Sequence, residues 1–438
     1  MSKSNVPTKV LPGFMELLPD RQAVFEGMKK TIESVYRSFG FLAIDTPAIE
    51  RAEVLLAKAG GETEKQIYRF TKGENELALR FDLTVPLARY VGEHVNDLNF
   101  PFRRYHIGKV YRGERPQKGR FREFYQCDID VIGKGSLDFA YDAELMAVIY
   151  QVFSDLKLPK FRIRINNRKI LSGFLDGIGA REHSADVLRV IDKMEKVSLQ
   201  ETRDSLAELG LDAGQIKQLE EFFASSGQSD EALAKLESLK IEGPMFAQGV
   251  SELKEVVSLA RVFGLPDEFV AVDLAIARGL DYYTGTVYET VLVDYPQIGS
   301  ICSGGRYDNL AGTYGQETLP GVGISIGLTR LFDQLCNLGL FSEAAYSSRV
   351  IVIPFDRTCL PAAINLAAKL RVAGIMAETY LADVKFKNKL AYANRSGSRY
   401  VVLVGEDEIK NRTWTLKDME TGQQESLGTE GLVARLRV

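Results

Sequence analysis

The feature that most constrains this chain is a pair of alternating stretches between Phe102 and Ile132, joined by the polar segment GERPQKG. Side chains of a β-strand alternate between its two faces, and Gly, Pro and Lys suit an exposed turn, so we expect a β-hairpin. The odd positions from 121 to 131 are mostly apolar and predict a buried face, with Glu123 as the exception. The even positions predict a polar working face, and they are Arg120, Arg122, Phe124, Gln126, Asp128 and Asp130.

This working face suits a nucleotide. Arg112 precedes the turn, and antiparallel pairing would bring it beside Arg122 and Gln126. Guanidinium groups bind phosphate oxygens, an aromatic ring such as Phe124 can stack on a base, and carboxylates can hold an amine or a metal. The same alternation also fits a solvent-facing hairpin with interleaved charges, so the run alone leaves both interpretations open.

Three glycine-containing segments could add to this face. ARGLDYYTGTVYE places Arg278 before two tyrosines, SGGRYDNL allows close backbone approach beside charged groups, and GVGISIGLTRL brings Arg330 to the start of a helix. Each also has an ordinary structural explanation, as core tyrosines, packing glycines or surface charges. None of them matches GxGxxG or the P-loop pattern, which excludes the two commonest nucleotide-binding fingerprints.

A chain of 438 residues is too long for one ordinary hydrophobic core. Apolar spacing predicts a helix over 20–38, a hairpin from QIYRF and LALRF around TKGENE, and a helix from DLTVPLARYV. The stretch after 348 alternates strands and helices. We expect an α+β fold with an antiparallel sheet flanked by helices. Its segments would be 1–184 and 263–336 for the main domain, 185–262 for a helical insertion, 337–347 for a linker and 348–438 for a small α/β domain.

Charge and cysteine content exclude several classes of protein. The net charge is only -4, so any contact with nucleic acid must be local. The N-terminus has no apolar signal stretch and no run is long enough to span a membrane, from which we expect a soluble, cytoplasmic protein with no membrane partner. The four cysteines form no CxxC pair and there are three histidines, so we expect no metal site.

Together, these motifs resemble those of class II aminoacyl-tRNA synthetases. YRGERPQKGRFREFYQCDIDVIG resembles motif 2, GVGISIGLTRL resembles motif 3, and the region of Pro47 resembles motif 1 at the dimer interface. RGLDYYTGTVYE and SGGRYD resemble two segments peculiar to histidyl-tRNA synthetases. The resemblance implies that the two main-domain segments form a catalytic domain with the class II antiparallel sheet. It also implies that the C-terminal α/β domain is an anticodon-binding domain.

The resemblance also implies a role for individual residues toward histidine. Asp82, Thr84 and Gln126 would meet its α-amino group, while Asp130 and Tyr283 would read the imidazole. Tyr282 would flank this pocket. The histidine-binding residues implied in this way are Asp82, Leu83, Thr84, Arg112, Gln126, Asp130, Arg278, Tyr282 and Tyr283.

Toward ATP, the resemblance implies that Arg112 binds the α-phosphate and that Phe124 packs on adenine. Arg278 and Arg112 would be the catalytic residues, because positive charge offsets the charge that develops as the carboxylate attacks phosphorus. Mg²⁺ is expected to arrive with ATP. The ATP-binding residues would be Arg112, Glu114, Arg120, Phe124 and Arg330, with Arg122 as a further helper.

The resemblance further implies binding of tRNA(His) and a homodimer. The segment KFKNKLAYANRSGSR supplies local basic charge for a phosphate backbone, although a solvated helix face would look the same. Arg115, Gln117 and Lys118 would lie near the acceptor end of the tRNA. The alternative is a histidine-binding regulatory paralogue that partners an ATP phosphoribosyltransferase. Such paralogues typically lack the C-terminal domain and the catalytic arginine, both of which this chain has.

Overall fold

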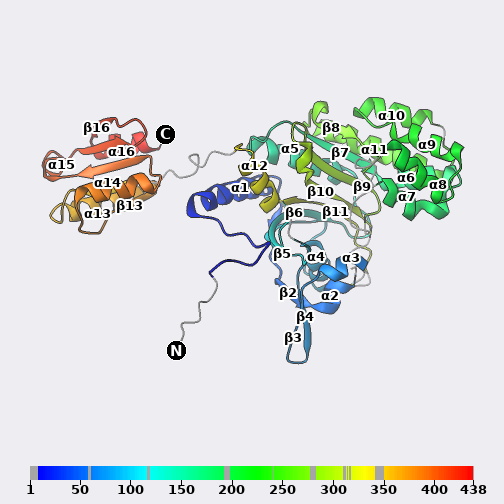
Figure 1. The fold of residues 1–438 in the computed structure, drawn as a ribbon, viewed down its shortest axis with the longest axis horizontal. Helices are drawn as coiled ribbons and strands as arrows, with labels where there is room; N and C mark the ends of the chain where they lie inside the picture. The colour runs from blue at the N-terminus through cyan, green and yellow to red at the C-terminus, as the bar shows by residue number, and fades with distance from the viewer. Residues whose placement is uncertain are drawn as a thin grey trace. The chain divides into compact units, whose positions relative to one another are not determined.

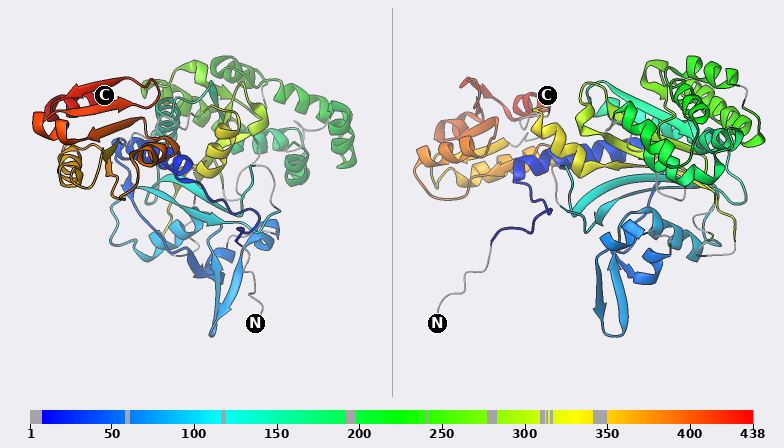
Figure 2. Two further views of the ribbon diagram at one scale, coloured as in Figure 1. Left: turned by 60° about the vertical axis from the view of Figure 1, so that its left-hand side comes forward. Right: turned by 45° about the vertical axis from the view of Figure 1, so that its right-hand side comes forward.

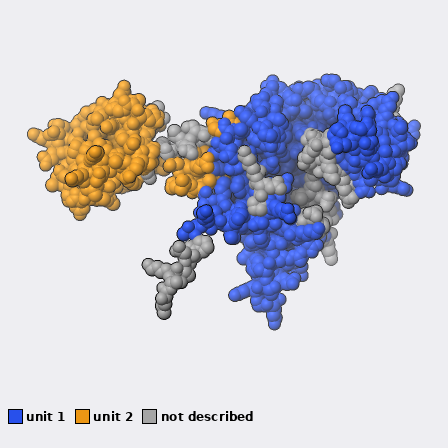
Figure 3. Space-filling model, in the orientation of Figure 1, with its two compact units in different colours: residues 1–16, 28–338 blue, residues 17–27, 339–438 orange. Residues whose placement is uncertain are grey.

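The computed structural model describes residues 8–57, 61–115, 119–191, 198–239, 241–276, 283–308, 312, 314, 317–340 and 350–437. The chain forms two compact units (Figure 3). The first consists of Met1–Glu16 and Met28–Leu338, and the second of Leu17–Gly27 and Gly339–Val438. Within the described ranges, no helix is long and apolar enough to cross a membrane.

The first unit is built on an eight-stranded sheet with the order β1-β5-β6-β11-β10-β9-β7-β8 (Figure 1). The six inner strands pair antiparallel, and each outermost strand pairs parallel with its neighbour. This confirms the predicted antiparallel sheet flanked by helices. The strands are β1 (Leu42–Ala43), β5 (Phe102–Tyr111), β6 (Glu123–Ile132), β7 (Phe161–Asn167), β8 (Val270–Val272), β9 (Thr286–Leu292), β10 (Ser300–Tyr307) and β11 (Gly321–Gly327).

The predicted hairpin of β5 and β6 lies inside this sheet, because β11 pairs with the other edge of β6. The polar positions Gln126, Asp128 and Asp130 are buried, which excludes a solvent-facing hairpin. The odd positions Cys127, Ile129 and Val131 are completely buried, as the alternation predicts. Several helices contact this sheet, among them residues 28–38 of α1 (Pro19–Ser38), α5 (Ala140–Asp155) and α12 (Leu328–Asn337).

A second, three-stranded sheet has the order β2-β4-β3, and its β3–β4 hairpin projects away from the large sheet (Figure 2). The predicted hairpin is confirmed, but its turn is tighter than TKGENE. Lys72 pairs with Asn75, which leaves only Gly73 and Glu74 in the turn, and Gly73 has a φ of 63°. The elements here are β2 (Ile49–Arg51), α2 (Ala52–Leu56), α3 (Gly61–Gln66), β3 (Arg69–Lys72), β4 (Asn75–Leu79) and α4 (Thr84–Glu93).

The stretch predicted as a helical insertion is helical. Two of its helices begin with reciprocal capping boxes, at Ser198 with Glu201 and at Asp212 with Gln215. The last helix, α11, packs closely against α6, so the boundaries of a separate insertion remain a prediction. The helices are α6 (Arg168–Gly177), η1 (Arg181–His183), α7 (Ser184–Ile191), α8 (Leu199–Glu208), α9 (Ala213–Phe223), α10 (Ser229–Ser238) and α11 (Pro244–Val262), followed by η3 (Asp267–Phe269) and later η4 (Pro296–Ile298).

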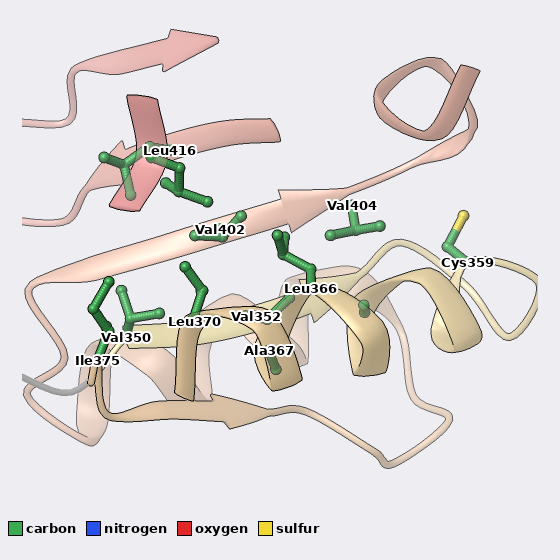
Figure 4. Packing of buried hydrophobic residues seen from close by; sticks show 12 residues of the cluster. Val350, Val352, Cys359, Leu366, Ala367, Leu370, Ile375, Val402, Val404 and Leu416 are labelled. Atoms are coloured by element: carbon green, nitrogen blue, oxygen red, sulfur yellow. The ribbon is translucent and has the colours of Figure 1, made fainter. Parts of the chain in front are cut away.

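The second unit contains a five-stranded sheet with the order β13-β12-β14-β15-β16, in which the first three strands are parallel. Val352 and Val402 face Leu366 and Leu370 of α13 in its core (Figure 4). The strands are β12 (Val350–Pro354), β13 (Ala377–Thr379), β14 (Tyr400–Val404), β15 (Trp414–Asp418) and β16 (Gln424–Leu427), and the helices are α13 (Leu360–Val372), α14 (Phe386–Arg395), α15 (Glu406–Asn411) and α16 (Thr429–Leu436).

Candidate active site

A cavity of about 500 Å³ lies over the polar face of the large sheet. Its floor comes from β6, β9, β10 and β11, and further residues come from the loop before α4 and from the ends of the β5–β6 connection. The structure brings together most of the side chains that the sequence predicts for the site. Those that line the cavity are Asp82, Thr84, Arg112, Glu114, Arg120, Phe124, Gln126, Tyr283 and Arg330.

Asp82 is positioned by the start of α4. Its Oδ1 accepts hydrogen bonds from the backbone N–H groups of Thr84, at 3.1 Å, and Val85, at 2.9 Å. Both groups lack partners inside the helix, so the carboxylate caps it. Burial raises the pKa of Asp82, and these bonds and the charge of Arg112 act against that rise. The second carboxylate oxygen is left for other contacts in the cavity.

Gln126 lies in the floor with its amide held from one side. Its Nε2 donates to Oγ of Ser325 at 2.7 Å. Its Oε1 is buried, and the described residues offer it no hydrogen-bond partner. A buried carbonyl oxygen without a donor costs free energy, so this atom is suited to a donor supplied by a ligand. Ser325 lines the cavity as well, a residue that the sequence prediction missed.

Asp130 stands behind the cavity lining rather than in it. The buried guanidinium of Arg104 forms an ion pair with its Oδ2, and the hydroxyl of Tyr307 donates to Oδ1 at 3.0 Å. Burial raises the pKa of Asp130 to about 6, and Arg104 opposes that rise. Leu83 is also fully buried outside the lining, and its carbonyl accepts from Arg104 at 3.4 Å. The sequence interpretation did not single out Arg104.

Arg112 follows the end of β5, and its guanidinium group contacts two aromatic rings. Its guanidinium carbon is 4.3 Å from the ring centroid of Phe81 and 5.1 Å from that of Phe124. Its Nε donates to the carbonyl of Phe81 at 3.3 Å. Cation–π contacts and one hydrogen bond from Nε hold the guanidinium group in the lining of the cavity.

The alternation predicted from residue 120 begins only at Glu123, where β6 starts. Phe121, expected on the buried face, therefore lines the cavity, and Arg122, expected on the working face, does not. Nε of Arg122 donates instead to the carbonyl of Glu114 at 3.0 Å. Arg120 does line the cavity, where its Nη1 lies 3.4 Å from Oε2 of Glu114. Residues outside a strand need not alternate, which explains both differences.

Arg330 is the third residue of α12, close to the predicted helix start. Its Nη2 donates to the carbonyl of Ile298 at 2.5 Å. Burial lowers its pKa, and the neighbouring charge of Arg120 lowers it further. The two guanidinium groups both line the cavity, Arg120 exposed and Arg330 half-buried, and their like charges repel, so this part of the cavity favours a polyanion.

Two predicted residues, Arg278 and Tyr282, lie outside the described residues, as do Gln117 and Lys118. The arginine of SGGRYDNL, Arg306, has a structural role, since it forms a buried ion pair with Asp142 and donates to the carbonyl of Leu137 at 2.9 Å. Among the lining residues that sequence reasoning missed are Glu289, Ser303 and Ser325. The period-two pattern of their strands could have placed them on the working face.

Comparison with known proteins assigns this arrangement to a family. The family model described as "Histidyl-tRNA synthetase" matches residues 13–331, and that described as "Anticodon binding domain" matches residues 349–438. The chain belongs to the histidyl-tRNA synthetase family. Its sequence is similar to a histidine--tRNA ligase from Clostridium tetani, with 56% identity over 98% of both chains.

Solved structures of the histidyl-tRNA synthetase family share the fold. A histidyl-tRNA synthetase from Nostoc sp. PCC 7120 superposes with a TM-score of 0.91 and 38% identity, over 99% of both chains. A Bacillus halodurans protein described as an ATP phosphoribosyltransferase regulatory subunit/histidyl-tRNA synthetase has a TM-score of 0.75 and 22% identity, over 91% of this chain and 98% of its own. The second likeness concerns the fold alone.

We predict that Gly323→Ala destabilises the chain, because an added Cβ would lie 2.0 Å from Oδ1 of Asp130 and 2.8 Å from the carbonyl of Ile129. Such overpacking typically costs about 1–3 kcal/mol. Urea unfolding would measure it. Gly327→Ala on the same strand is the control, since a Cβ there meets nothing within 4 Å and its φ of -76° suits alanine. Equal unfolding midpoints for the two variants would contradict the close packing of Asp130 on Gly323.

Proposed function

We propose that this chain joins L-histidine to tRNA(His) in two steps, forming histidyl-adenylate from histidine and ATP and then transferring the histidyl group to the tRNA. One observation carries the proposal: a single cavity holds a carboxylate and an amide oxygen beside guanidinium groups that lie toward the β5–β6 turn. The first set suits an ammonium group and the second a triphosphate. Members of the family that the chain belongs to use ATP as a substrate.

For histidine, we propose that the α-ammonium group binds Asp82, Thr84 and the amide oxygen of Gln126. Asp82 and Gln126 both line the cavity. Oδ1 of Asp82 already accepts from the N–H of Val85, so its other carboxylate oxygen can meet the ligand. Nε2 of Gln126 already donates to Ser325, so its amide oxygen can meet the ligand as well. Tyr283, which lines the cavity, and Asp130, which lies behind it, would read the imidazole. Leu83 would back this pocket, and Tyr282 would flank it.

For ATP, we propose that Arg112 binds the α-phosphate and that the adenine packs on Phe124. The contact between Arg112 and the Phe124 ring supports both roles, because a base on the ring and a phosphate at the guanidinium would then be neighbours. Glu114 and Arg120 would lie near the nucleotide, and Arg330 would engage the γ-phosphate side.

In the first step, an oxygen of the histidine carboxylate attacks the α-phosphorus in line as the bond to the bridging oxygen breaks, and pyrophosphate leaves. Arg112 and Arg278 would offset the charge that develops on the α-phosphoryl oxygens. In the second step, a hydroxyl of the terminal tRNA adenosine attacks the activated carbonyl and AMP leaves. Preorganised positive charge of this kind stabilises a transition state without reorganisation of solvent.

Mg²⁺ would arrive with ATP. Among the residues that the structure describes, no group of three or more His, Cys, Asp or Glu side chains could hold a metal ion alone. Two carboxylates line the cavity, those of Glu114 and Glu289, and the negative charge of each raises the pKa of Arg330. Carboxylate oxygens are ligands that Mg²⁺ prefers. We propose that these two would hold the ion together with phosphate oxygens, where it neutralises phosphate charge when bound.

For tRNA, we propose that the second unit binds the anticodon and that Arg115 lies near the acceptor end. Four basic side chains of KFKNKLAYANRSGSR are exposed, but Lys389 is buried. Its Nζ donates to the carbonyl of Pro354 at 3.0 Å, so it supports the packing of α14 and is removed from the proposed RNA surface. The exposed residues are Lys385, Lys387, Arg395 and Arg399.

A homodimer in the cytoplasm is part of the same proposal, since motif 1 of the resemblance belongs to a dimer interface. The regulatory paralogue that partners an ATP phosphoribosyltransferase is not favoured. The histidine--tRNA ligase with 56% identity matches this chain over 98% of its length, and the anticodon-binding model matches residues 349–438.

Exchange of labelled pyrophosphate into ATP tests the activation step. We expect exchange with histidine and no exchange with any other amino acid, because only histidine would satisfy both the ammonium and the imidazole contacts. The assay needs the purified full chain, ATP, Mg²⁺ and one amino acid at a time. Measurable binding of histidine without exchange would move the chain to the regulatory class.

Arg112→Ala should lower the rate of pyrophosphate exchange by about 100-fold or more, the usual cost of one lost transition-state donor. Arg181→Ala is the matched control, because that side chain is 75% exposed and does not line the cavity. The exchange rate at saturating histidine and ATP is the measurement. A rate within threefold of the unsubstituted chain would rule out the proposed role of Arg112.

A further inference from the structure

Three polar side chains on two paired strands form a hydrogen-bonded row in the cavity floor. Ser325 of β11 is in register with Asp128 of β6, and Gly327 is in register with Gln126. Ser325 hydrogen-bonds Asp128 on one side and accepts from Nε2 of Gln126, at 2.7 Å, on the other. Gln126 and Ser325 line the cavity, whereas Asp128 is 2% exposed and lies behind them. Neither Asp128 nor Ser325 has a role in the substrate contacts proposed above.

The chemistry of the groups fixes the direction of every bond in this row. An ionised carboxylate only accepts, so the Ser325 hydroxyl must donate its single hydrogen to Asp128. The Ser325 oxygen can then only accept from Gln126, which must present its NH₂ group. The amide oxygen of Gln126 is thereby turned to the other side, where it is buried without a partner among the described residues.

We propose that Asp128 and Ser325 are positioning residues that lock the amide of Gln126 with its oxygen toward the amino-acid substrate, and so make the site select a cationic amine. The proposal deepens the proposed function and rests on it, since Gln126 is the group that would meet the α-ammonium of histidine. An amide turned by 180° would present a donor to that ammonium instead, which is repulsive. The orientation of one amide thus becomes a determinant of specificity.

Opposing effects of the surroundings set the charge on Asp128. Burial raises its pKa to about 7, and the guanidinium of Arg104 opposes this rise. Arg104 is fully buried in β5, and its Nε and Nη1 have no hydrogen-bond partner among the described residues. Its charge is therefore little screened by water, and it acts on Asp128 as well as on its direct partner Asp130. Above pH 7 the carboxylate form, and with it the direction of the row, prevails.

The test compares two ligands that differ only in the amine, histidine and 3-(imidazol-4-yl)propionate, by calorimetric titration of the full chain at pH 8. Asp128→Asn supplies an amide that can donate to Ser325, reverse the row and turn the NH₂ group of Gln126 toward the ligand. We expect the affinity for histidine to fall roughly tenfold to a hundredfold, the worth of a hydrogen bond to a charged group. The affinity for the propionate should stay unchanged.

Ser325→Ala provides the second variant, because it removes the link between Asp128 and Gln126 without touching either. It should reduce the preference for histidine, and Asp128→Asn added to it should change that preference no further. Asp142→Asn is the matched control: it alters another fully buried aspartate, paired with Arg306, and should lower stability while leaving the ligand preference intact.

Three results would overturn the proposal, and the first two are a full preference for histidine in Asp128→Asn and equal effects of Asp128→Asn with and without the Ser325 hydroxyl. A loss of affinity for both ligands together would also overturn it, since that is what a merely structural role predicts. Failure of the proposed function is distinguishable, because it appears in the unsubstituted chain, either as no preference for histidine over the propionate or as histidine binding without pyrophosphate exchange.

Discussion

The buried guanidinium of Arg104 is the interaction on which the site depends. Three carboxylates, those of Asp82, Asp128 and Asp130, lie in the same part of the first unit, and burial raises the pKa of each. The charge of Asp82 raises the pKa of the other two further, and Arg104 acts against the rise at all three. A cluster of buried acids is tolerated only with such a counter-charge. Arg104 therefore allows the sheet to carry acidic groups in its interior, where water does not weaken them.

The arrangement of strands places the acidic and polar groups of β6 at the cavity. The even-numbered side chains of β6 from Phe124 onward share one face of the sheet, where Phe124 and Gln126 line the cavity and Asp128 and Asp130 are buried behind it. On β6, the amide oxygen of Gln126 is the acceptor for an ammonium group. The guanidinium of Arg112 lies nearer the β5–β6 turn, beside the Phe124 ring. One face of one sheet thus presents complementary charge to both substrates of the proposed reaction.

The sequence predicts the local parts of this account well and the long-range parts poorly. The alternation of FYQCDIDVI was enough to foresee a strand with an apolar back at Cys127 and a polar front at Gln126. It could not reveal that Ser325, about 200 residues later, would pair with Asp128, because register between distant strands is set by tertiary packing. The role of Arg104 was missed for the same reason. Its neighbours in FRRYH are also charged, and only the pairing with Asp130 distinguishes it.

Two other differences have equally physical causes. Lys389 reads as a surface charge in a basic helix, yet its amine is held by the carbonyl at the end of β12. The strands β15 and β16 escaped prediction because WTLKD and QESL are too polar and short to signal a sheet on their own. In both cases a partner outside the segment itself, Pro354 for Lys389 and a paired strand for β15 and β16, supplies what the segment lacks.

Charging of tRNA is the measurement that tests the central claim most directly, since it needs the amino-acid pocket, the nucleotide site and the second unit in one experiment. Labelled histidine would be incubated with the purified chain, ATP, Mg²⁺ and total tRNA, and acid-insoluble label counted. The account predicts that label appears on tRNA, that an excess of unlabelled histidine abolishes it, and that no other amino acid competes. A chain that binds histidine and ATP but leaves the tRNA unlabelled would contradict it.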